Sequence, residues 1–488
     1  MKSAIVIGGG LAGLACGVAL AEAGWRVRLF EQKPFLGGRA TSYVLPNGEH
    51  VDNCQHVTLG CCTNLADFYR RVGSADKIKF FDELVFLDPQ GRRGTMKAGF
   101  LPAPYHMTGS FLTFAPLTMR DKLSIARAML DIVAAKGKTA DLTEPRPISM
   151  LEWLHRRHQT KGAIERFWRV VLVSALDEEL DRTDARYGVD VFWKAFLMNS
   201  TGYRMGVPIV PLAELYAGCK AAIESRGGEV NLRSPVRSLN AEGATIRSVQ
   251  FDAGREESAD AYVFAVAHDA LFDLMPESIR RAEPSLTNLA KIKTAPITGV
   301  HFWFDRPVLD EPFVTLLDTN TQWIFNKSML YAEQKGTTNN KEQKGATASG
   351  EQYLQMVISA SYDLLKKSRQ EIIDICLREV RQALPRAQAA QLMKSTVIKE
   401  VAATFSPQPG VDRWRPPQQT KIPALFFAGD WTATGWPATM EGAVRSGYLA
   451  AEAVLRSSDS AGSARQFLQP DLPPSGLMSM FMPKQNPK

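Results

Sequence analysis

Near the start of the chain, the stretch AIVIGGGLAG (residues 4–13) joins a short β-branched run to a cluster of glycines. The run is typical of a buried parallel strand, and Gly8, Gly10 and Gly13 fit the pattern G-x-G-x-x-G. Gly8 permits a tight turn, Gly10 lets a pyrophosphate approach the backbone, and Gly13 lets a helix pack closely on the strand. We therefore predict that this stretch begins a dinucleotide-binding βαβ unit.

The residues that follow complete the predicted unit. Small and apolar residues over 11–23 predict a helix, and residues 27–30 predict a second strand. Glu31 ends that strand about 20 residues beyond the glycines, where an acid can bind ribose hydroxyls. The uncharged run 3–21 approaches the length of a membrane span, but the clustered glycines disfavour both a spanning helix and a signal peptide. We expect no transmembrane span.

The overall composition is that of a soluble globular protein, because 45% of the 488 residues are hydrophobic and 22% are charged. The 58 Lys and Arg residues exceed the 51 Asp and Glu residues, which gives a net charge of +7. This surplus fits an anionic cofactor or membrane surface, and the lack of a dense basic stripe argues against nucleic acid. Six cysteines without a Cys-x-x-Cys pair indicate reduced thiols and a cytoplasmic protein, and the scattered histidines indicate no metal site.

The turn GGRA (residues 37–40) follows Glu31 closely and is the first motif that distinguishes one dinucleotide from another. Here the sequence resembles the large flavoprotein group that contains amine oxidases and phytoene-type desaturases. In that group the turn follows the ribose acid, and its arginine lies near the FAD phosphates and the flavin. The resemblance implies that FAD is the cofactor and that Gly38 and Arg39 contact it. Two glycines permit a close backbone approach, and an arginine presents a planar fork to phosphate oxygens.

Later segments resemble the remaining FAD-binding parts of the same group. The stretch GGEV (residues 227–230) and Val236 look like the strand pair that reaches the adenine, with backbone contacts at Val236; a plain hairpin is the alternative. An apolar strand ends at Gly429 and Asp430, which resembles the acid near the ribityl chain and the pyrophosphate. A helix is then predicted from Met440 and Glu441, and its positive N-terminal end would stabilise the negative charge of reduced flavin.

These segments predict an α/β fold with two interleaved domains. The resemblance implies a Rossmann-like FAD-binding domain with a mostly parallel sheet, assembled from residues 1–72, 205–285 and 407–456. The intervening residues 73–204 and 286–406 would form an α+β substrate domain. The Ser- and Pro-rich residues 457–488 are expected to form a loose tail.

Three stretches narrow the resemblance to the squalene-associated FAD-dependent desaturase family, also described as hydroxysqualene dehydroxylases. They are VDNCQHV (51–57), PITGVHFWFDRP (296–307) and AGDWTATGWPATMEGA (428–443), and Cys54 replaces the family's usual glycine. The resemblance implies reductive removal of a hydroxyl from hydroxysqualene to give squalene, in hopanoid-type lipid synthesis. A carotenoid-type desaturase or isomerase is the alternative enzyme. A non-enzymatic prenyl-lipid carrier is a further alternative, which the intact phosphate glycines and Glu31 disfavour.

Asp52 and His56 are the candidate catalytic pair, because the segment that holds them follows the GGRA turn toward the flavin. Loss of an allylic hydroxyl needs a proton donor, so we interpret these residues as an acid and its orienting partner. The alternative is that both side chains only hold the turn by hydrogen bonds. Amine oxidases of this group carry a lysine near the flavin, and Gly299 occupies the aligned position, which counts against amine oxidation.

An apolar stretch over residues 98–119 suggests where a polyisoprenoid lipid substrate would enter. It contains no Asp, Glu, Lys or Arg, and Pro102, Pro104 and Pro116 forbid one continuous spanning helix. Together with nearby basic residues it predicts peripheral contact with an anionic membrane, on the inner face of the cell membrane. The alternative is that this stretch belongs to the core of the substrate domain.

Overall fold

The computed structural model describes residues 1–45, 48–138, 146–335, 350–458 and 465–482. A parallel five-stranded sheet carries the start of the chain, in the order β10-β2-β1-β14-β20. Its strands come from all three segments expected to bind FAD: β1 (Ser3–Ile7), β2 (Arg26–Phe30), β10 (Glu229–Asn231), β14 (Ala261–Phe264) and β20 (Leu425–Phe427). The β-branched and apolar runs read from the sequence are therefore the buried strands of one sheet.

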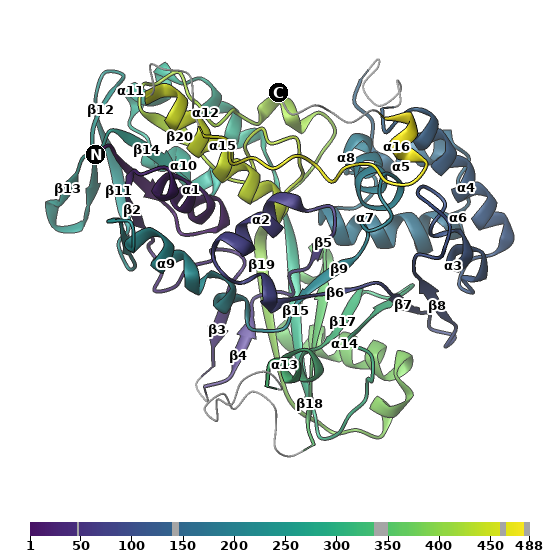
Figure 1. The fold of residues 1–488 in the computed structure, drawn as a ribbon. Helices are drawn as coiled ribbons and strands as arrows, with labels where there is room; N and C mark the ends of the chain where they lie inside the picture. Colours follow the sequence, from purple (N-terminus) through teal and green to yellow (C-terminus); the bar gives the residue numbers. More distant parts are fainter. Residues whose placement is uncertain (46–47, 139–145, 336–349, 459–464, 483–488) are drawn as a thin grey trace.

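The uncharged run at the start of the chain divides into β1 and the buried helix α1 (Leu11–Glu22). Helix α15 (Met440–Ser458) lies against α1, and Figure 1 shows the two side by side although they are far apart in sequence. Gly447 makes this approach possible, because a Cβ there would lie 2.3 Å from the carbonyl oxygen of Ala12. Within the described residues, no helix is both long and apolar enough to cross a membrane.

A mixed seven-stranded sheet forms the second part of the structure, in the order β19-β15-β18-β17-β16-β7-β8. Its neighbours are antiparallel except for the parallel pair β7 and β16. Helix α14 (Arg369–Ala383) packs its apolar side on this sheet. The strands are β7 (Leu84–Leu87), β8 (Arg93–Met96), β15 (Thr294–Phe304), β16 (Phe313–Leu316), β17 (Trp323–Asn326), β18 (Gln352–Ile358) and β19 (Leu392–Phe405).

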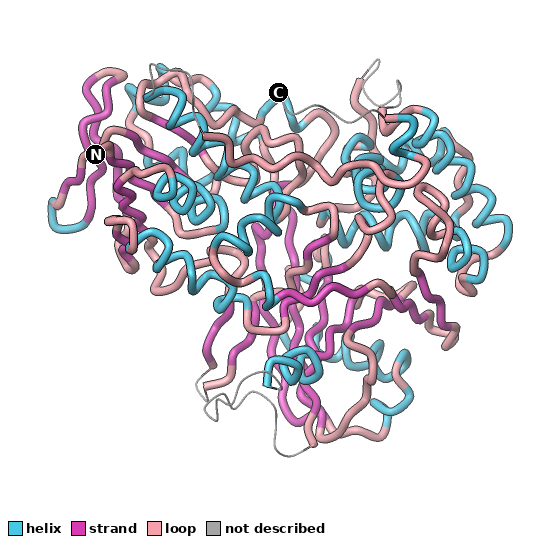
Figure 2. Tube along the Cα trace, viewed as in Figure 1, coloured by secondary structure: helices cyan, strands magenta, loops and turns pink. Residues whose placement is uncertain are grey.

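A group of helices from residues 108–197 forms the third part, and Figure 2 shows it on one side of the molecule, away from the five-stranded sheet. It includes α3 (Thr108–Thr113), α4 (Met119–Ala134), α5 (Met150–Arg156), α7 (Arg169–Leu176), α8 (Ala185–Val191) and the π-helical turns Ile164–Trp168 and Phe192–Leu197. These helices and the seven-stranded sheet come from the segments expected to form the substrate domain. The predicted α/β fold class is confirmed.

Smaller elements connect these parts. Three short sheets contain β3 (Ser42–Val44) with β4 (His50–Asp52), β5 (Thr58–Leu59) with β9 (Met205–Pro208) and β6 (Ile78–Phe81), and β11 (Val236–Glu242) with β12 (Thr245–Phe251) and β13 (Glu256–Glu257). Of the helices between them, α2 (Thr63–Arg71), α9 (Ala217–Glu224) and α13 (Lys327–Lys335) bear on the site.

The C-terminal segment differs from the expected loose tail over residues 465–482. Phe467 is fully buried beside α15, and the Leu477 N–H donates to the Ala103 carbonyl at 3.1 Å. Met478 is also buried, in the short helix α16 (Met478–Phe481). The Ser- and Pro-rich composition hid these two apolar anchors, which bury enough surface to hold the segment along the body. The remaining residues of the expected tail lie outside the described ranges.

Candidate functional site

The glycine turn after β1 is built to leave space for an anion. A Cβ at Gly13 would lie 1.9 Å from the Gly8 carbonyl oxygen, so this glycine is required for helix α1 to pack on the turn. Gly8 has a φ of +109°, which only glycine adopts readily. Gly10 begins α1 without a side-chain cap, and the nearest atom to a Cβ there is 3.9 Å away. The N-terminus of α1 therefore has no side-chain cap and leaves room beside Gly10, as a pyrophosphate site requires.

Glu31 lies beside this turn at the end of β2. Its carboxylate is buried and accepts hydrogen bonds from the backbone N–H groups of Gly9 and Lys33, both at 2.7 Å. The backbone carbonyl of Glu31 accepts from the Ser234 N–H at 2.9 Å, which places the start of β11, and thus Val236, next to the acid. The turn at residues 227–228 joins α9 to β10, so the alternative of a plain hairpin is wrong.

Arg39 connects the N-terminal turn to the C-terminal segment. Its guanidinium donates to Asp430 Oδ1 at 2.6 Å and to the Ala403 carbonyl at 2.8 Å. Asn53 holds the turn from the other side, since its amide donates to the Arg39 carbonyl and accepts from the Thr41 N–H. Gly38 carries a positive φ and lies against Gly10. The predicted phosphate residues therefore come together from opposite ends of the chain.

Gly429 and helix α15 complete this cluster. The Gly429 N–H donates to Ser446 Oγ at 2.8 Å, so the helix positions the turn that holds Asp430. The Glu441 carboxylate accepts from the Leu65 N–H at 2.7 Å and from the Asn64 side chain at 2.9 Å. The Glu441 side chain therefore caps α2, and contact of Met440 and Glu441 with the cofactor stays a prediction for their backbone at the start of α15.

Arg415 is a residue of this site that the sequence reasoning missed. Its side chain is buried, and its Nη2 donates to the carbonyls of Asp430, Thr432 and Trp436 at 2.6–2.9 Å. Its Nη1 donates to the Tyr187 hydroxyl at 2.6 Å, in helix α8. Arg415 thus fixes the turn after Gly429 and links it to the helical part. A single arginine between two prolines and a tryptophan gives no local sequence signal for this role.

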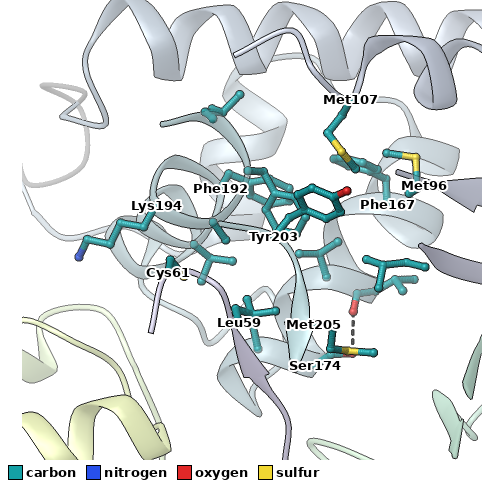
Figure 3. A pocket seen from close by; sticks show the side chains of 18 of the residues that line it. Leu59, Cys61, Met96, Met107, Phe167, Ser174, Phe192, Lys194, Tyr203 and Met205 are labelled. Atoms are coloured by element: carbon teal, nitrogen blue, oxygen red, sulfur yellow. Dashed lines mark hydrogen bonds between the residues drawn. The ribbon is translucent and has the colours of Figure 1, made fainter. Parts of the chain in front are cut away.

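A largely apolar pocket of about 580 Å³ reaches this cluster from the helical part. Gln55, Met440 and Glu441 line its inner end, and Leu112, Met119 and Leu123 line its outer end, where all three are exposed. In Figure 3, Phe167, Phe192, Tyr203, Met96 and Met107 gather around one space, whereas the Lys194 ammonium points away from it. Such a lining suits a hydrocarbon better than a polar molecule.

The two candidate catalytic residues lie behind the inner end of this pocket. The Asp52 carboxylate is fully buried and receives the ammonium of Lys327 at 2.8 Å and the Tyr331 hydroxyl at 3.1 Å. Burial alone would raise the pKa of Asp52, but the charge and hydrogen bond of Lys327 outweigh it and hold this pKa below its usual value. Asp52 is therefore an ion-paired carboxylate, an arrangement that does not favour the predicted role as proton donor.

His56 is close to Asp52 in sequence but bonds elsewhere. Its Nδ1 lies 3.1 Å from the Cys54 carbonyl, and burial lowers the pKa of its imidazole. Within the described residues the His56 and Asp52 side chains share no hydrogen bond, so the expected pairing of an acid with its orienting partner stays a proposal. Gln55, between them, is the residue of the three that lines the pocket.

Gly299 shows why a lysine would not fit at the aligned position. A Cβ there would lie 2.9 Å from the Asn53 carbonyl oxygen and 3.7 Å from the Cys54 Cα. The backbone of the segment after the GGRA turn therefore occupies the direction in which a side chain would extend. Across the described residues, no group of three His, Cys, Asp or Glu side chains is arranged to hold a metal ion.

Asp177, at the end of α7, is a buried carboxyl that the sequence reasoning also missed. It accepts hydrogen bonds from the Ala360 N–H at 2.7 Å and the Thr404 hydroxyl at 2.8 Å. Burial, with a smaller contribution from neighbouring Glu178, raises the pKa of Asp177 well above its ordinary value. The folded protein therefore binds this proton more tightly than the unfolded chain does.

Asp177→Asn is expected to stabilise the protein at alkaline pH. The contribution of the neutral carboxyl is fully present below the ordinary Asp pKa and is lost as the pH rises through the raised pKa. The variant cannot ionise, so we expect its unfolding free energy to exceed that of the wild type by roughly 1–3 kcal/mol at about pH 8 and to match it at about pH 4. Thermal unfolding across this range measures the difference, with the exposed Asp363→Asn as control. Parallel pH profiles for wild type and Asp177→Asn would contradict the prediction.

Comparisons with known proteins agree with this geometry. The sequence matches the family described as flavin containing amine oxidoreductase over residues 11–455. It is 26% identical over 475 residues to zeta-carotene desaturase of Synechocystis, covering 92% of this chain and 96% of that protein. It is 25% identical over 483 residues to 15-cis-phytoene desaturase of Synechococcus elongatus, covering 93% and 96%.

Solved structures share the fold. An oxidoreductase from Methanosarcina mazei matches with a TM-score of 0.69 at 16% identity, covering 91% of this chain and 98% of that one. A putrescine oxidase variant matches with a TM-score of 0.66 at 15% identity, covering 92% and 98%. The glycine turn, the acid beside it and the open N-terminus of α1 provide the phosphate site that FAD needs. The chain belongs to the flavin containing amine oxidoreductase family and is an FAD-dependent oxidoreductase.

Proposed function

We propose that this protein oxidises a polyisoprenoid hydrocarbon, as a carotenoid-type desaturase does. The observation that carries the proposal is the apolar pocket, which extends from exposed residues of α4 to Gln55 and Met440 beside the cofactor cluster. The named relatives support this direction, since they are a zeta-carotene desaturase and a phytoene desaturase.

The pocket explains what the chain contributes to such a reaction. FAD, when bound, supplies a hydride acceptor or donor. The apolar side chains of the pocket bind the hydrocarbon, exclude water and hold it in one orientation against the cofactor, so that the entropy of positioning is lost on binding and not in the reacting step. The ion-paired Asp52 carboxylate does not provide an acid for departure of a hydroxyl, which also favours hydride removal from a hydrocarbon over dehydroxylation.

Reductive dehydroxylation of hydroxysqualene is the second candidate. It is supported by the resemblance of the stretches at residues 51–57 and 428–443, which are the segments that meet around Arg39 and Asp430. In this reaction His56 or Asp52 would assist departure of the hydroxyl. Activity close to that of the wild type in Asp52→Asn and His56→Ala would remove both residues from that role.

Two anaerobic incubations distinguish these candidates. Oxidised enzyme is mixed with phytoene or zeta-carotene, and reduced enzyme is mixed with hydroxysqualene; products are identified by chromatography and the flavin is followed by absorbance. New double bonds together with bleaching of the flavin support desaturation. Squalene together with reoxidation of the flavin supports the second candidate, and unchanged substrates in both incubations contradict the proposed function.

A surface at the outer end of the pocket supports contact with a membrane. Large apolar side chains are exposed along α3, α4, α16 and the loop before α3. Two basic residues lie nearby, Arg120 in α4 and Lys136 just after its C-terminal end. Because several of these side chains also line the pocket, we propose that a lipid substrate enters here from an anionic bilayer. This entrance surface comprises Phe100, Leu101, Tyr105, Leu112, Met119, Leu123, Leu130, Met480 and Phe481.

The double variant Phe100→Asp and Met480→Asp is expected to lose liposome binding. Wild-type protein should float with liposomes that contain anionic lipid at low salt, and the variant should stay in the soluble fraction, because two new charges face the bilayer. Met393→Asp is the control, since Met393 is also an exposed apolar residue but belongs to β19, outside the entrance surface. Wild-type protein that fails to float at low salt would contradict membrane contact.

A further inference from the structure

Lys327 is a fully buried lysine that no part of the proposed reaction uses directly. It begins helix α13, and its ammonium donates to Asp52 Oδ2 and to Gln55 Oε1, both at 2.8 Å. It also lies 4.4 Å from the ring centroid of Tyr331, whose hydroxyl donates to the same Asp52 oxygen. Two segments separated by more than half of the chain therefore meet around one buried charge pair.

Two further donors complete the hydrogen bonds of the Asp52 carboxylate. Asp52 Oδ1 accepts from the Ser42 hydroxyl at 2.7 Å and from the Leu212 N–H at 3.1 Å. The Asp52 carboxylate thus accepts hydrogen bonds from four donors, and its charge fixes the position of the Lys327 ammonium. A buried ion pair is weak evidence for stability, because removing both charges from water costs about as much as their attraction returns. Stability of the fold therefore does not by itself account for this pair.

Gln55 connects the charge pair to the pocket. Its Oε1 accepts from Lys327, and its Nε2 donates to the His56 carbonyl at 3.1 Å, so both ends of the carboxamide are fixed. Of Lys327, Asp52 and Gln55, only Gln55 lines the pocket, at the end where Met440 also lies. The orientation of this amide against a hydrocarbon in the pocket depends on where Lys327 places its ammonium.

We propose that Lys327 is a positioning residue, which acts through Gln55 to fix the inner end of the substrate pocket beside the cofactor. The inference rests on the proposed function, because it assumes that a hydrocarbon chain reaches Gln55. Hydride transfer depends steeply on the separation of the two reacting atoms. A displaced Gln55 side chain is therefore expected to lower the rate of hydride transfer more than it weakens binding of the hydrocarbon. Lys327 is therefore expected to affect kcat far more than KM.

The test compares four FAD-loaded variants: Gln55→Leu, Lys327→Met with Asp52→Asn, the triple combination, and Lys394→Met as control. Lys394, on β19, forms an ion pair with Glu49, and neither residue lines the pocket. Pairing Lys327→Met with Asp52→Asn leaves no uncompensated buried charge, so the protein should fold and bind FAD. We expect kcat to fall about 10- to 100-fold in this variant and in Gln55→Leu, with KM nearly unchanged. The triple variant should be no worse than Gln55→Leu alone.

Normal kcat in the Lys327→Met, Asp52→Asn variant would overturn the inference, and so would losses that multiply in the triple variant. A second readout separates this failure from failure of the proposed function. Squalane, the fully saturated hydrocarbon with the carbon skeleton of squalene and no allylic hydride to lose, is titrated into each protein while the flavin absorbance is followed. No spectral change in the wild type contradicts the proposed hydrocarbon site itself. A change in the wild type that is identical in the Lys327→Met, Asp52→Asn variant contradicts only the role of Lys327.

Discussion

Gly13→Ala is expected to give a destabilised protein without bound flavin, whereas Gly10→Ala is expected to give a folded protein with weakened FAD binding. The two glycines belong to one motif but meet different surroundings. A Cβ at Gly13 would lie 1.9 Å from the Gly8 carbonyl oxygen and 3.1 Å from the Ala265 Cβ, so α1 would have to move away from the sheet. At Gly10 a Cβ has room in the protein, and its methyl group would meet only the incoming pyrophosphate.

The expected magnitudes follow from these distances. Overpacking against backbone atoms costs roughly 1–3 kcal/mol or more, so Gly13→Ala should lower the melting temperature as well as flavin content. Gly10→Ala should keep the melting temperature of the apoprotein and raise the Kd for FAD about 10- to 100-fold, which corresponds to roughly 1.4–2.7 kcal/mol. Flavin absorbance, FAD titration of the apoprotein and thermal unfolding measure these three quantities.

Gly109→Ala is the matched control, because Gly109 is exposed in α3 and a Cβ there would meet no atom within 4 Å. It should bind FAD like the wild type, with stability unchanged or slightly raised by the better helix propensity of alanine. The prediction would be contradicted if Gly13→Ala were yellow and as stable as the wild type. Equal Kd values for Gly10→Ala and the wild type would show that no phosphate approaches Gly10.

Local patterns in the sequence predicted the parts of the site that depend on local geometry. The glycine turn, Glu31 and the turn before Asp430 each lie where a strand ends, and a strand's end is visible in its apolar run. The Rossmann-like sheet followed from those strands because parallel strands bring their carboxyl ends to one edge.

Roles that depend on contacts between residues far apart in the sequence could not be predicted from local patterns. Lys327 is the first residue of α13, directly after strand β17, and it contacts Asp52 and Gln55, which lie 275 and 272 residues earlier in the chain. Such a contact leaves no local signal in the sequence. The charge state of Asp52 depends on that lysine, so the sequence suggested an acid where the structure has an ion-paired carboxylate. The buried contacts of Phe467 were likewise hidden, because composition reports the average polarity of a segment and not its anchors.

Arg415→Lys is expected to destabilise the protein strongly and to release FAD, although the charge is kept. The guanidinium of Arg415 donates hydrogen bonds to four acceptors, which are the carbonyls of Asp430, Thr432 and Trp436 and the hydroxyl of Tyr187. A lysine ammonium has three donors on a single atom and cannot reach acceptors that are spread around a planar fork. Buried carbonyls left without a donor cost about 1–3 kcal/mol each, so a loss of roughly 3 kcal/mol or more is expected.

The loss of flavin follows from the same geometry, because Arg415 fixes the turn that holds Asp430, and Asp430 holds the guanidinium of Arg39. Denaturant unfolding of the holoprotein and apoprotein separates the two effects: the variant should be less stable in both forms and should gain less stability from added FAD. Arg413→Lys is the control, since Arg413 is an exposed neighbour that lies 4.7 Å from the Trp414 ring centroid. If Arg415→Lys stayed within about 0.5 kcal/mol of the wild type and bound FAD equally well, the turn after Gly429 would be held by its own backbone and not by this arginine.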